Sequence, residues 1–223
     1  MKEIFSEKLT GRIEACGVIA VLVIDRAEDA VPLAKALLAG GIDVMELTLR
    51  TPAAIEALKE IKRNVPEMIA GIGTILTPEQ ITEAKAAGAE FGVAPGMNSR
   101  VVAKAKEAGL PFAPGICTPS DIEAALEHGC RLLKFFPAET SGGLKHLKNM
   151  SAPYMHLGLK FSPLGGLDQN NLASYLADPS VAAVGGSWIA KRETIKANDW
   201  AAITAAAAEA TETVYSARLK IQL

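Results

Sequence analysis

Short apolar runs alternate with longer amphipathic stretches along the chain. The runs have the length of strands buried on both faces, and the stretches between them repeat apolar positions at helical spacing. Thr-Pro pairs, which suit the first positions of a helix, occur at residues 51–52, 77–78 and 118–119. The predicted strands are residues 17–24, 42–49, 67–72, 90–95, 110–115, 131–136, 159–164 and 181–186.

This alternation predicts an α/β fold with parallel strands joined by helices. Eight such units close most naturally into a (β/α)8 TIM barrel, so we expect one barrel domain over residues 1–223. A doubly wound open sheet is the alternative, but no G-x-G-x-x-G motif opens the first strand–helix turn. We expect an extra N-terminal helix over residues 2–16 and a last helix over about 199–218.

Composition and charge exclude several classes of protein. Of the 223 residues, 49% are apolar and 22% charged, and the formal net charge is −2. This balance suits a globular protein and gives no indication of a nucleic-acid partner or an anionic membrane surface. The N-terminus lacks the apolar region of a signal peptide, and no apolar run reaches the roughly 18 residues that span a bilayer.

Cysteine and histidine positions predict neither disulfides nor a metal. Three cysteines without C-x-x-C spacing indicate reduced thiols and a cytoplasmic protein. The three histidines, His128, His146 and His156, show neither H-x-x-x-H nor H-E-x-x-H spacing. We therefore expect no metal, and no other cofactor.

Polar side chains interrupt two of the predicted strands near their carboxyl ends. Glu46, Thr48 and Arg50 share one face of the second strand, because side chains alternate faces along a strand. Lys134 lies inside the apolar run of the sixth strand and shares a face with Phe136. Functional residues of a barrel lie at this end of the strands, so Lys134 and Glu46 can converge there.

A lysine surrounded by phenylalanines suggests covalent chemistry. An unprotonated amine attacks a ketone to form a Schiff base, and burial disfavours the protonated form. Glu46 would move the protons that the carbinolamine, iminium and enamine require. The alternative for Lys134 is a structural lysine that simply pairs with Glu46.

Glycine pairs follow the last two predicted strands. In barrel enzymes, the loops after strands 7 and 8 often bind phosphate through backbone N–H groups. Gly165, Gly166, Gly185 and Gly186 would allow the backbone to approach phosphate oxygens, and Ser187 would add a hydroxyl donor. The pairs therefore predict a phosphorylated substrate, although each pair alone is more often a turn.

Taken together, these motifs resemble the KDPG (2-keto-3-deoxy-6-phosphogluconate) aldolase family, also called 4-hydroxy-2-oxoglutarate aldolases. The resemblance covers nearly the whole chain in order. It implies a class I, metal-independent (β/α)8 aldolase that splits KDPG into pyruvate and glyceraldehyde 3-phosphate, commonly as a homotrimer. The motifs are E-x-T-x-R (46–50), G-x-G-T (71–74), APG (94–96), PGICTPSD (114–121), KFFPAE (134–139), GG (165–166) and GGSW (185–188).

The resemblance assigns a role to each matching residue. It implies that Lys134 forms the Schiff base, Glu46 is the general acid/base, Arg50 binds the pyruvate carboxylate and Thr74 contacts the pyruvyl group. The remaining matches are the phosphate-binding residues Gly165, Gly166, Gly186 and Ser187, and the apolar pocket residues Phe136 and Pro95.

Two positions depart from the family pattern. Leu164 replaces the threonine that precedes the glycine pair in well-known members, and Ile72 replaces a smaller alanine. Loss of a hydroxyl from a site that reads substrate hydroxyls changes selectivity, so both the sugar acid and its C4 configuration stay open. Two other hypotheses remain: a phosphosugar epimerase or isomerase with Glu46 as base, and a non-catalytic barrel subunit that binds a phosphometabolite.

Overall fold

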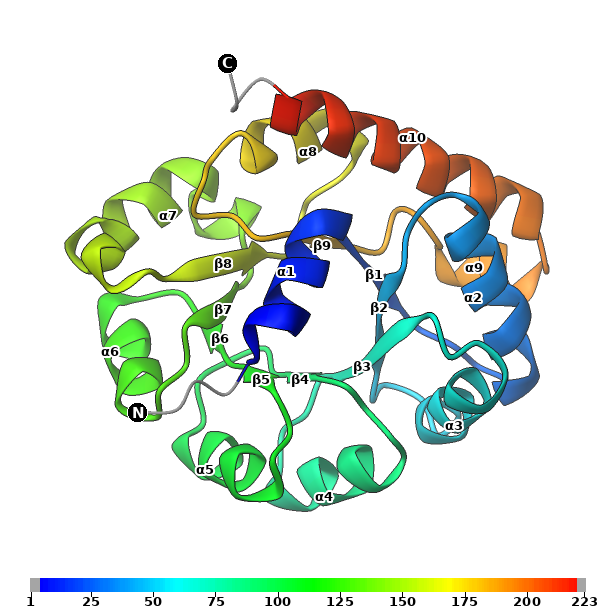
Figure 1. Cartoon of the computed structure of the whole chain (residues 1–223), viewed down its shortest axis with the longest axis horizontal. Coiled ribbons are helices and arrows are strands. Elements are labelled where there is room, and N and C mark those ends of the chain that lie inside the picture. The colour runs from blue at the N-terminus through cyan, green and yellow to red at the C-terminus, as the bar shows by residue number, and fades with distance from the viewer. Residues whose placement is uncertain (1–4, 220–223) are drawn as a thin grey trace.

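The computed structural model describes residues 5–219, in which parallel strands are surrounded by helices (Figure 1). The strands are β1 (Val18–Leu22), β2 (Val44–Thr48), β3 (Ile69–Gly73), β4 (Gly92–Val93), β5 (Phe112–Ala113), β6 (Gly115–Ile116), β7 (Leu132–Phe135), β8 (Lys160–Pro163) and β9 (Val184–Gly186). The helices are α1 (Glu7–Cys16), α2 (Ala30–Ala39), α3 (Ala54–Asn64), α4 (Pro78–Ala86), α5 (Ser99–Ala108), α6 (Pro119–Glu127), α7 (Gly143–Ser151), α8 (Gln169–Leu176), α9 (Arg192–Lys196) and α10 (Trp200–Leu219). Three short 3-10 segments complete the described part.

All the pairings between these strands are parallel, which confirms the predicted α/β class. The strands form a six-stranded sheet in the order β5-β4-β3-β2-β1-β9 and a three-stranded sheet in the order β6-β7-β8. The predicted strand at 110–115 is divided into β5 and β6 at Pro114. Proline has no N–H to donate to a ladder, which accounts for a break at this position.

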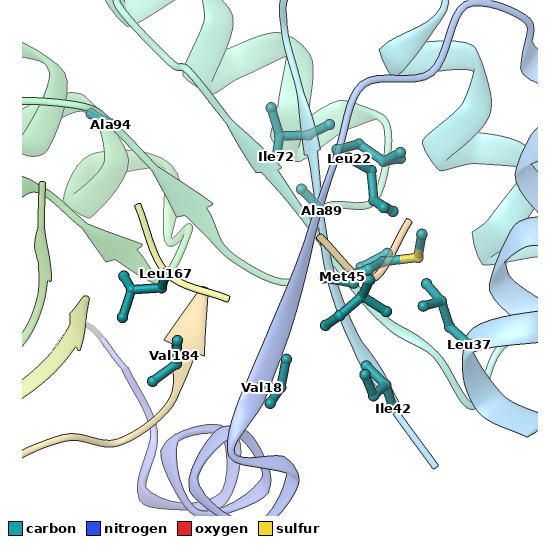
Figure 2. Close-up of a cluster of buried hydrophobic side chains, with 14 of the residues drawn as sticks. Val18, Leu22, Leu37, Ile42, Met45, Ile72, Ala89, Ala94, Leu167 and Val184 are labelled. Carbon is teal, nitrogen blue, oxygen red and sulfur yellow. The ribbon is translucent and has the colours of Figure 1, made fainter. Parts of the chain in front are cut away.

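Side chains alternate between two buried clusters on the two faces of the strands. Along β1, Val18, Ala20 and Leu22 join an outer cluster between the strands and helices, part of which Figure 2 shows. Ile19 and Val21 join an inner cluster instead. Because both faces of the strands are buried, their sequences are continuous apolar runs and do not alternate between apolar and polar residues.

The first helix lies against the inner cluster. Ile13 of α1 is buried in that cluster together with Phe5, and Figure 1 shows α1 lying across the ring of strands. Ser6 caps the helix through a hydrogen bond from the Leu9 N–H, and Gly17 ends it in the left-handed conformation. The predicted N-terminal helix began at residue 2, and residues 2–4 lie outside the described part.

Two of the three Thr-Pro pairs start helices as predicted. Thr77 and Thr118 each form a capping box, with proline at the first position of α4 and α6. The pair at 51–52 does not, because the Thr51 hydroxyl donates to the Ile24 carbonyl and α3 begins only at Ala54. Within residues 5–219, no helix is both long and apolar enough to cross a membrane.

Candidate active site

An ion pair between Lys134 and Glu46 lies at the centre of the site. Lys134 on β7 and Glu46 on β2 are both buried, and Lys134 Nζ lies 3.3 Å from Glu46 Oε1. Two buried opposite charges stabilise one another, but removing both from water carries a large desolvation cost. A pair of this kind is a weak source of stability, which makes it a candidate for a functional role.

The neighbouring strand β3 leaves room for the Glu46 side chain. Thr48 on β2 is in register with Gly73 on β3, two residues along from Glu46. A Cβ atom at Gly73 would overlap the Glu46 carboxylate. The glycine of the G-x-G-T motif therefore has a direct steric role beside the carboxylate.

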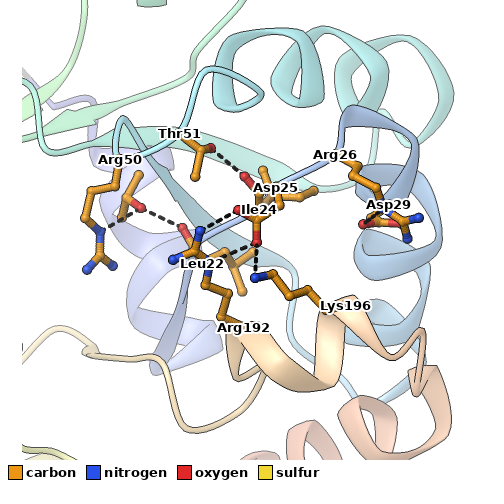
Figure 3. Close-up of polar contacts among 10 residues, drawn as sticks. Leu22, Ile24, Asp25, Arg26, Asp29, Arg50, Thr51, Arg192 and Lys196 are labelled. Atoms are coloured by element: carbon orange, nitrogen blue, oxygen red, sulfur yellow. Dashed lines mark hydrogen bonds and ion pairs between the residues drawn. The ribbon is translucent and has the colours of Figure 1, made fainter.

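Thr48 connects the end of β2 to the neighbouring strand. Its buried hydroxyl donates to the Leu22 carbonyl on β1 at 2.8 Å and accepts from Arg50 Nε at 3.1 Å (Figure 3). These two bonds orient the Arg50 guanidinium at the mouth of the site. The E-x-T-x-R motif is thus one connected unit, in which the threonine positions the arginine.

A cavity of about 360 Å³ brings the predicted site residues together. Nine of the ten predicted site residues line it, and Gly166 is the exception. The lining consists of Val21, Glu46, Thr48, Arg50, Thr74, Pro95, Lys134, Phe136, Leu164, Gly165, Gly185, Gly186 and Ser187.

Sequence reasoning missed Val21 entirely. Val21 is in register with Glu46 across β1 and β2, and it belongs to the inner cluster that contains Ile19. An apolar residue inside an apolar strand carries no signal of its own. Its register opposite Glu46, once known, would have placed it in the site.

A larger groove of about 670 Å³ lies elsewhere, between α8 and α10. Its lining is mostly alanine, serine and threonine, with Glu212 as the one titratable side chain among the lining residues. Acid–base chemistry requires paired or perturbed titratable groups. The smaller cavity that contains Lys134 and Glu46 is therefore the better candidate.

The surroundings of Lys134 are apolar on one side and polar on the other. Its Nζ lies 5.5 Å from the centroid of the Phe136 ring, within cation–π range. Ser162 on β8 is in register with Lys134, and the buried Ser162 hydroxyl has no hydrogen-bond partner among the described residues. Thr74, at the carboxyl end of β3, has a φ of 60°, an uncommon conformation for a β-branched residue.

Gly165 and Gly166 form a turn after β8, whereas Gly185 and Gly186 are the last two residues of β9. Gly165 and Gly166 have φ values of 97° and 80°, which favour glycine. Gly186 is enclosed, because a Cβ atom there would overlap the Trp188 ring. Ser187 is exposed on the cavity wall next to Gly186.

The two departures from the family pattern have different surroundings. Leu164 lines the cavity, and its side chain occupies the position that a Cβ atom at Gly185 would take. Ile72 is buried in the outer cluster, where Figure 2 shows it, and is not among the residues that line the cavity. Only the first replacement therefore alters the surface that a bound substrate meets.

An ion-pair network joins the loop after β1 to helix α9. Asp25 accepts hydrogen bonds from Arg192 at 2.8 and 2.5 Å, and Lys196 Nζ lies 3.4 Å away (Figure 3). The hydrogen bond from Arg192 holds the pKa of Asp25 at about 2, below its ordinary value of 3.8. The network ties the segment that follows β9 to the loop after β1.

No group of three histidine, cysteine, aspartate or glutamate side chains in residues 5–219 could hold a metal ion. The side chains that line the cavity include an amine, a carboxylate, a guanidinium and hydroxyls. Such a set can bind an oxoacid, transfer protons and form an imine with a ketone.

Comparison with known proteins decides the family. The sequence model of the aldolase family described as KDPG and KHG aldolase matches residues 9–206. The chain belongs to this family.

Curated members of the KDPG and KHG aldolase family align along most of the chain. A 2-dehydro-3-deoxy-phosphogluconate aldolase of Treponema pallidum is 47% identical over 193 residues, covering 86% of this chain and 91% of that protein. The KHG/KDPG aldolase of Escherichia coli K12 is 42% identical over 195 residues, covering 87% of this chain and 91% of that protein.

Solved KDPG aldolases share the fold. The Legionella pneumophila enzyme, with pyruvate captured at low pH as a covalent carbinolamine intermediate, has a TM-score of 0.85 and 42% identity, covering 89% of this chain and 96% of that chain. The Zymomonas mobilis ZM4 enzyme with 3-phosphoglycerate has a TM-score of 0.83 and 38% identity, covering 92% of this chain and 96% of that chain.

Proposed function

We propose that this protein is a class I aldolase that cleaves KDPG, or a close 2-keto-3-deoxy sugar acid phosphate, into pyruvate and glyceraldehyde 3-phosphate. The observation that carries the proposal is the buried Lys134–Glu46 pair at the base of a cavity of about 360 Å³. A covalent carbinolamine of pyruvate in the similar Legionella pneumophila aldolase supports the same chemistry here. The reaction is a carbon–carbon lyase step in carbohydrate metabolism of the Entner-Doudoroff type.

Lys134 acts as the nucleophile. Its neutral amine attacks the C2 ketone, and loss of water from the carbinolamine gives a protonated imine. The imine accepts the electron pair of the C3–C4 bond as that bond breaks, which leaves an enamine on the lysine. Protonation of the enamine at C3 and hydrolysis of the imine release pyruvate and restore the amine.

Glu46 moves the protons. Its carboxylate lies within hydrogen-bond distance of Lys134 Nζ, so it can take a proton from the Lys134 ammonium and, as the acid, deliver that proton to the departing carbinolamine hydroxyl. It then removes the proton of the C4 hydroxyl as the aldehyde forms. Atoms balance over the cycle, because the water lost on imine formation returns on hydrolysis.

The remaining lining residues bind the two ends of the substrate. Arg50 pairs with the carboxylate, Thr74 contacts the pyruvyl group, and the side chains of Pro95 and Phe136 form the apolar wall. At the far end, we assign the phosphate to the turn after β8 and to the end of β9, through Gly165, Gly166, Gly186 and Ser187. The Zymomonas mobilis aldolase was solved with 3-phosphoglycerate, a phosphorylated acid, which supports a phosphate site of this kind.

We further infer one closed (β/α)8 barrel domain over residues 1–223. In its support, β5 and β6 flank Pro114 as two halves of one strand, and parallel bridges join Phe161 to Val181 and Leu164 to Gly185. These contacts link the two sheets at both edges. A homotrimer is inferred from the family resemblance and is checked by light scattering.

A cytoplasmic location is also inferred, from the cysteines. Cys16, Cys117 and Cys130 are all free thiols. Burial raises the pKa of Cys16 to about 11 and that of Cys130 to about 12, so both stay protonated at neutral pH. Unpaired, unreactive thiols are typical of reducing compartments.

Borohydride trapping tests the proposed chemistry. Pyruvate and borohydride are added to the wild type and to Lys134→Ala, followed by intact mass and peptide mapping. We expect one pyruvyl adduct on the wild-type peptide that contains Lys134 and none on the variant. Lys160→Ala is the matched control, since Lys160 is also on a strand but pairs with Glu14 outside the cavity.

Two results of the trapping experiment would contradict the proposal. Wild-type trapping by Lys134→Ala would show that the Schiff-base lysine is misassigned. A folded wild type that binds phosphate but forms no adduct would favour an epimerase with Glu46 as base, or a binding subunit. The epimerase would turn over a phosphosugar without forming an adduct, whereas the binding subunit would not turn it over.

A further inference from the structure

The Gly165–Gly166 turn is held from behind by the segment that follows β7. The Ala138 N–H donates to the Leu164 carbonyl at 2.7 Å, and the Glu139 N–H donates to the Gly165 carbonyl at 3.0 Å. In a trans peptide, C=O and N–H point in opposite directions. The N–H groups of Gly165 and Gly166 therefore point away from this segment, and neither donates a hydrogen bond within residues 5–219.

A second anchor comes from the start of α8. Asn171 Nδ2 donates to the Gly166 carbonyl at 3.1 Å, while Asn171 Oδ1 accepts from the Asp168 N–H at 2.9 Å. Asp168 in turn caps α8 in a capping box with Asn171. Three successive carbonyls of the turn, from Leu164 to Gly166, are thus each fixed by a hydrogen bond.

The Glu139 side chain completes this support. Its Cβ and Cγ atoms lie 2.7 and 3.0 Å from the position of a Cβ atom at Gly166, so the Glu139 stem packs directly on the Gly166 backbone. Its carboxylate accepts a hydrogen bond from Tyr175 Oη on α8 at 2.5 Å. The Tyr175 side chain is buried, with a residue exposure of 2%.

The Tyr175 hydroxyl keeps its proton to a higher pH than an exposed tyrosine does. Burial, followed by the hydrogen bond to Glu139, raises the pKa of Tyr175 well above its ordinary value. Gly143 leaves space for the contact, because a Cβ atom there would lie 3.2 Å from Glu139 Oε1 and 3.4 Å from Tyr175 Oη. The pair therefore has a fixed geometry between the loop after β7 and α8.

We propose that Glu139 and Tyr175 are positioning residues for phosphate binding, because they press the Gly166 peptide into place and hold a carboxylate away from the phosphate. The proposal rests on the proposed function, which assigns the phosphate to this turn. A carboxylate that was free beside the turn would repel the phosphate and would also compete for its N–H groups. The Tyr175 hydroxyl prevents this by fixing the carboxylate against α8.

The test compares two aldehydes that differ only in the phosphate. Condensation with pyruvate is measured for glyceraldehyde 3-phosphate and for unphosphorylated glyceraldehyde. In Tyr175→Phe, we expect KM for glyceraldehyde 3-phosphate to rise by about tenfold, the equivalent of about one hydrogen bond. The kinetic constants for glyceraldehyde and pyruvate trapping at Lys134 should both equal those of the wild type.

Two further variants separate positioning from general stability. Tyr154→Phe is the matched control, since Tyr154 Oη donates to Glu123 at 2.7 Å outside the cavity, and it should leave both aldehydes unaffected. Glu139→Gln keeps an acceptor for Tyr175 and removes the charge. We expect it to retain wild-type KM for glyceraldehyde 3-phosphate, or to lower it.

An equal change for both aldehydes in Tyr175→Phe, or no change for either, would overturn the proposal. Absence of a pyruvate adduct in the wild type would instead overturn the proposed function. In that event, 31P NMR titration with inorganic phosphate tests whether the Glu139–Tyr175 pair still supports phosphate binding. Weaker phosphate binding by Tyr175→Phe than by Tyr154→Phe would support it, and equal binding would refute it.

Discussion

Gly73 on β3 faces the Glu46 carboxylate so closely that any Cβ atom at this position would overlap it. The glycine carries no chemical group, yet its lack of a side chain leaves room for the carboxylate of Glu46, the proposed general acid/base. Gly73 is not among the glycines with positive φ, so the constraint there is steric and not conformational.

Gly73→Ala should therefore impair turnover. A displaced Glu46 no longer reaches Lys134, and a misplacement of about 1 Å at a catalytic group costs roughly 100-fold in kcat. Overpacking should also lower the free energy of unfolding by about 1–3 kcal/mol. Steady-state kinetics and urea unfolding measure the two effects separately.

The control is Gly11→Ala in α1, where no heavy atom lies within 4 Å of a new Cβ. It should raise stability by about 0.5–1 kcal/mol and leave kcat unchanged. A Gly73→Ala enzyme with wild-type kcat would contradict the steric role.

Glu46→Gln tests proton transfer without a change of shape. An amide cannot exchange the protons that imine formation and retro-aldol cleavage require, so we expect kcat to fall about 10²- to 10⁴-fold. The rate of borohydride trapping with pyruvate should fall as well, because the carbinolamine loses its proton donor. Glu90→Gln is the control, since Glu90 pairs with Lys62 at 2.6 Å outside the cavity. A kcat within a few-fold of wild type would exclude Glu46 as the principal acid/base.

The Asp25–Arg192 ion pair predicts a pH dependence of stability. The folded pKa of about 2 lies below the ordinary value of 3.8, so the ionised carboxylate stabilises the folded state above that ordinary value. This contribution disappears as the pH falls through the folded pKa. The difference in unfolding free energy between wild type and Asp25→Asn should thus be largest above about pH 5, decrease as the pH falls toward the folded pKa of about 2, and vanish only below it.

Urea unfolding at several pH values, with and without salt, measures this difference. Salt should reduce it, because the pair is exposed to solvent. Glu56→Gln removes an exposed carboxylate paired with Lys59 at 2.9 Å and should have a negligible effect at every pH. A difference for Asp25→Asn that grows as the pH falls would contradict the assignment.

The reactive pair could be predicted from the sequence because its signal is local. Lys134 and Glu46 are polar residues inside apolar strands. Because side chains alternate between the two faces of a strand, the sequence also indicates which neighbouring residues share a face with each of them. Parallel strands end at one edge of the fold, so the two residues could be expected to meet. The structure joins them at 3.3 Å.

Other features depend on contacts that no local pattern encodes. Tyr175 meets Glu139 across 36 residues, and nothing in the helix α8 sequence distinguishes this tyrosine from a core residue. Gly166 was predicted to bind phosphate through its backbone, which stays a prediction, but nothing in the sequence indicated that this backbone packs on the Glu139 stem. Thr51 was expected to cap a helix, but its hydroxyl found a tertiary partner in the Ile24 carbonyl. In each case a long-range contact decided the local structure.

Leu164 gives the last prediction, which concerns selectivity. This side chain lines the cavity where it meets the Gly165 turn, and it presents only apolar atoms. An apolar wall discriminates weakly between substrates that differ in a hydroxyl group, whereas a hydrogen-bonding group discriminates strongly. We therefore expect Leu164→Thr to increase the ratio of kcat/KM values for the two C4 epimers of the substrate by about tenfold or more. The smaller side chain should also lower stability by about 2 kcal/mol, which thermal unfolding checks.

Ile72→Val is the control for Leu164→Thr, because Ile72 is the other departure from the family pattern but lies in the outer cluster. It should cost about 0.5–1.5 kcal/mol in stability and leave the epimer ratio unchanged. An unchanged ratio in Leu164→Thr would mean that the C4 hydroxyl is read elsewhere in the cavity, where Thr48, Thr74 and Ser187 are the lining residues with hydroxyl groups. A ratio altered by Ile72→Val would instead show that packing behind β3 controls the shape of the site.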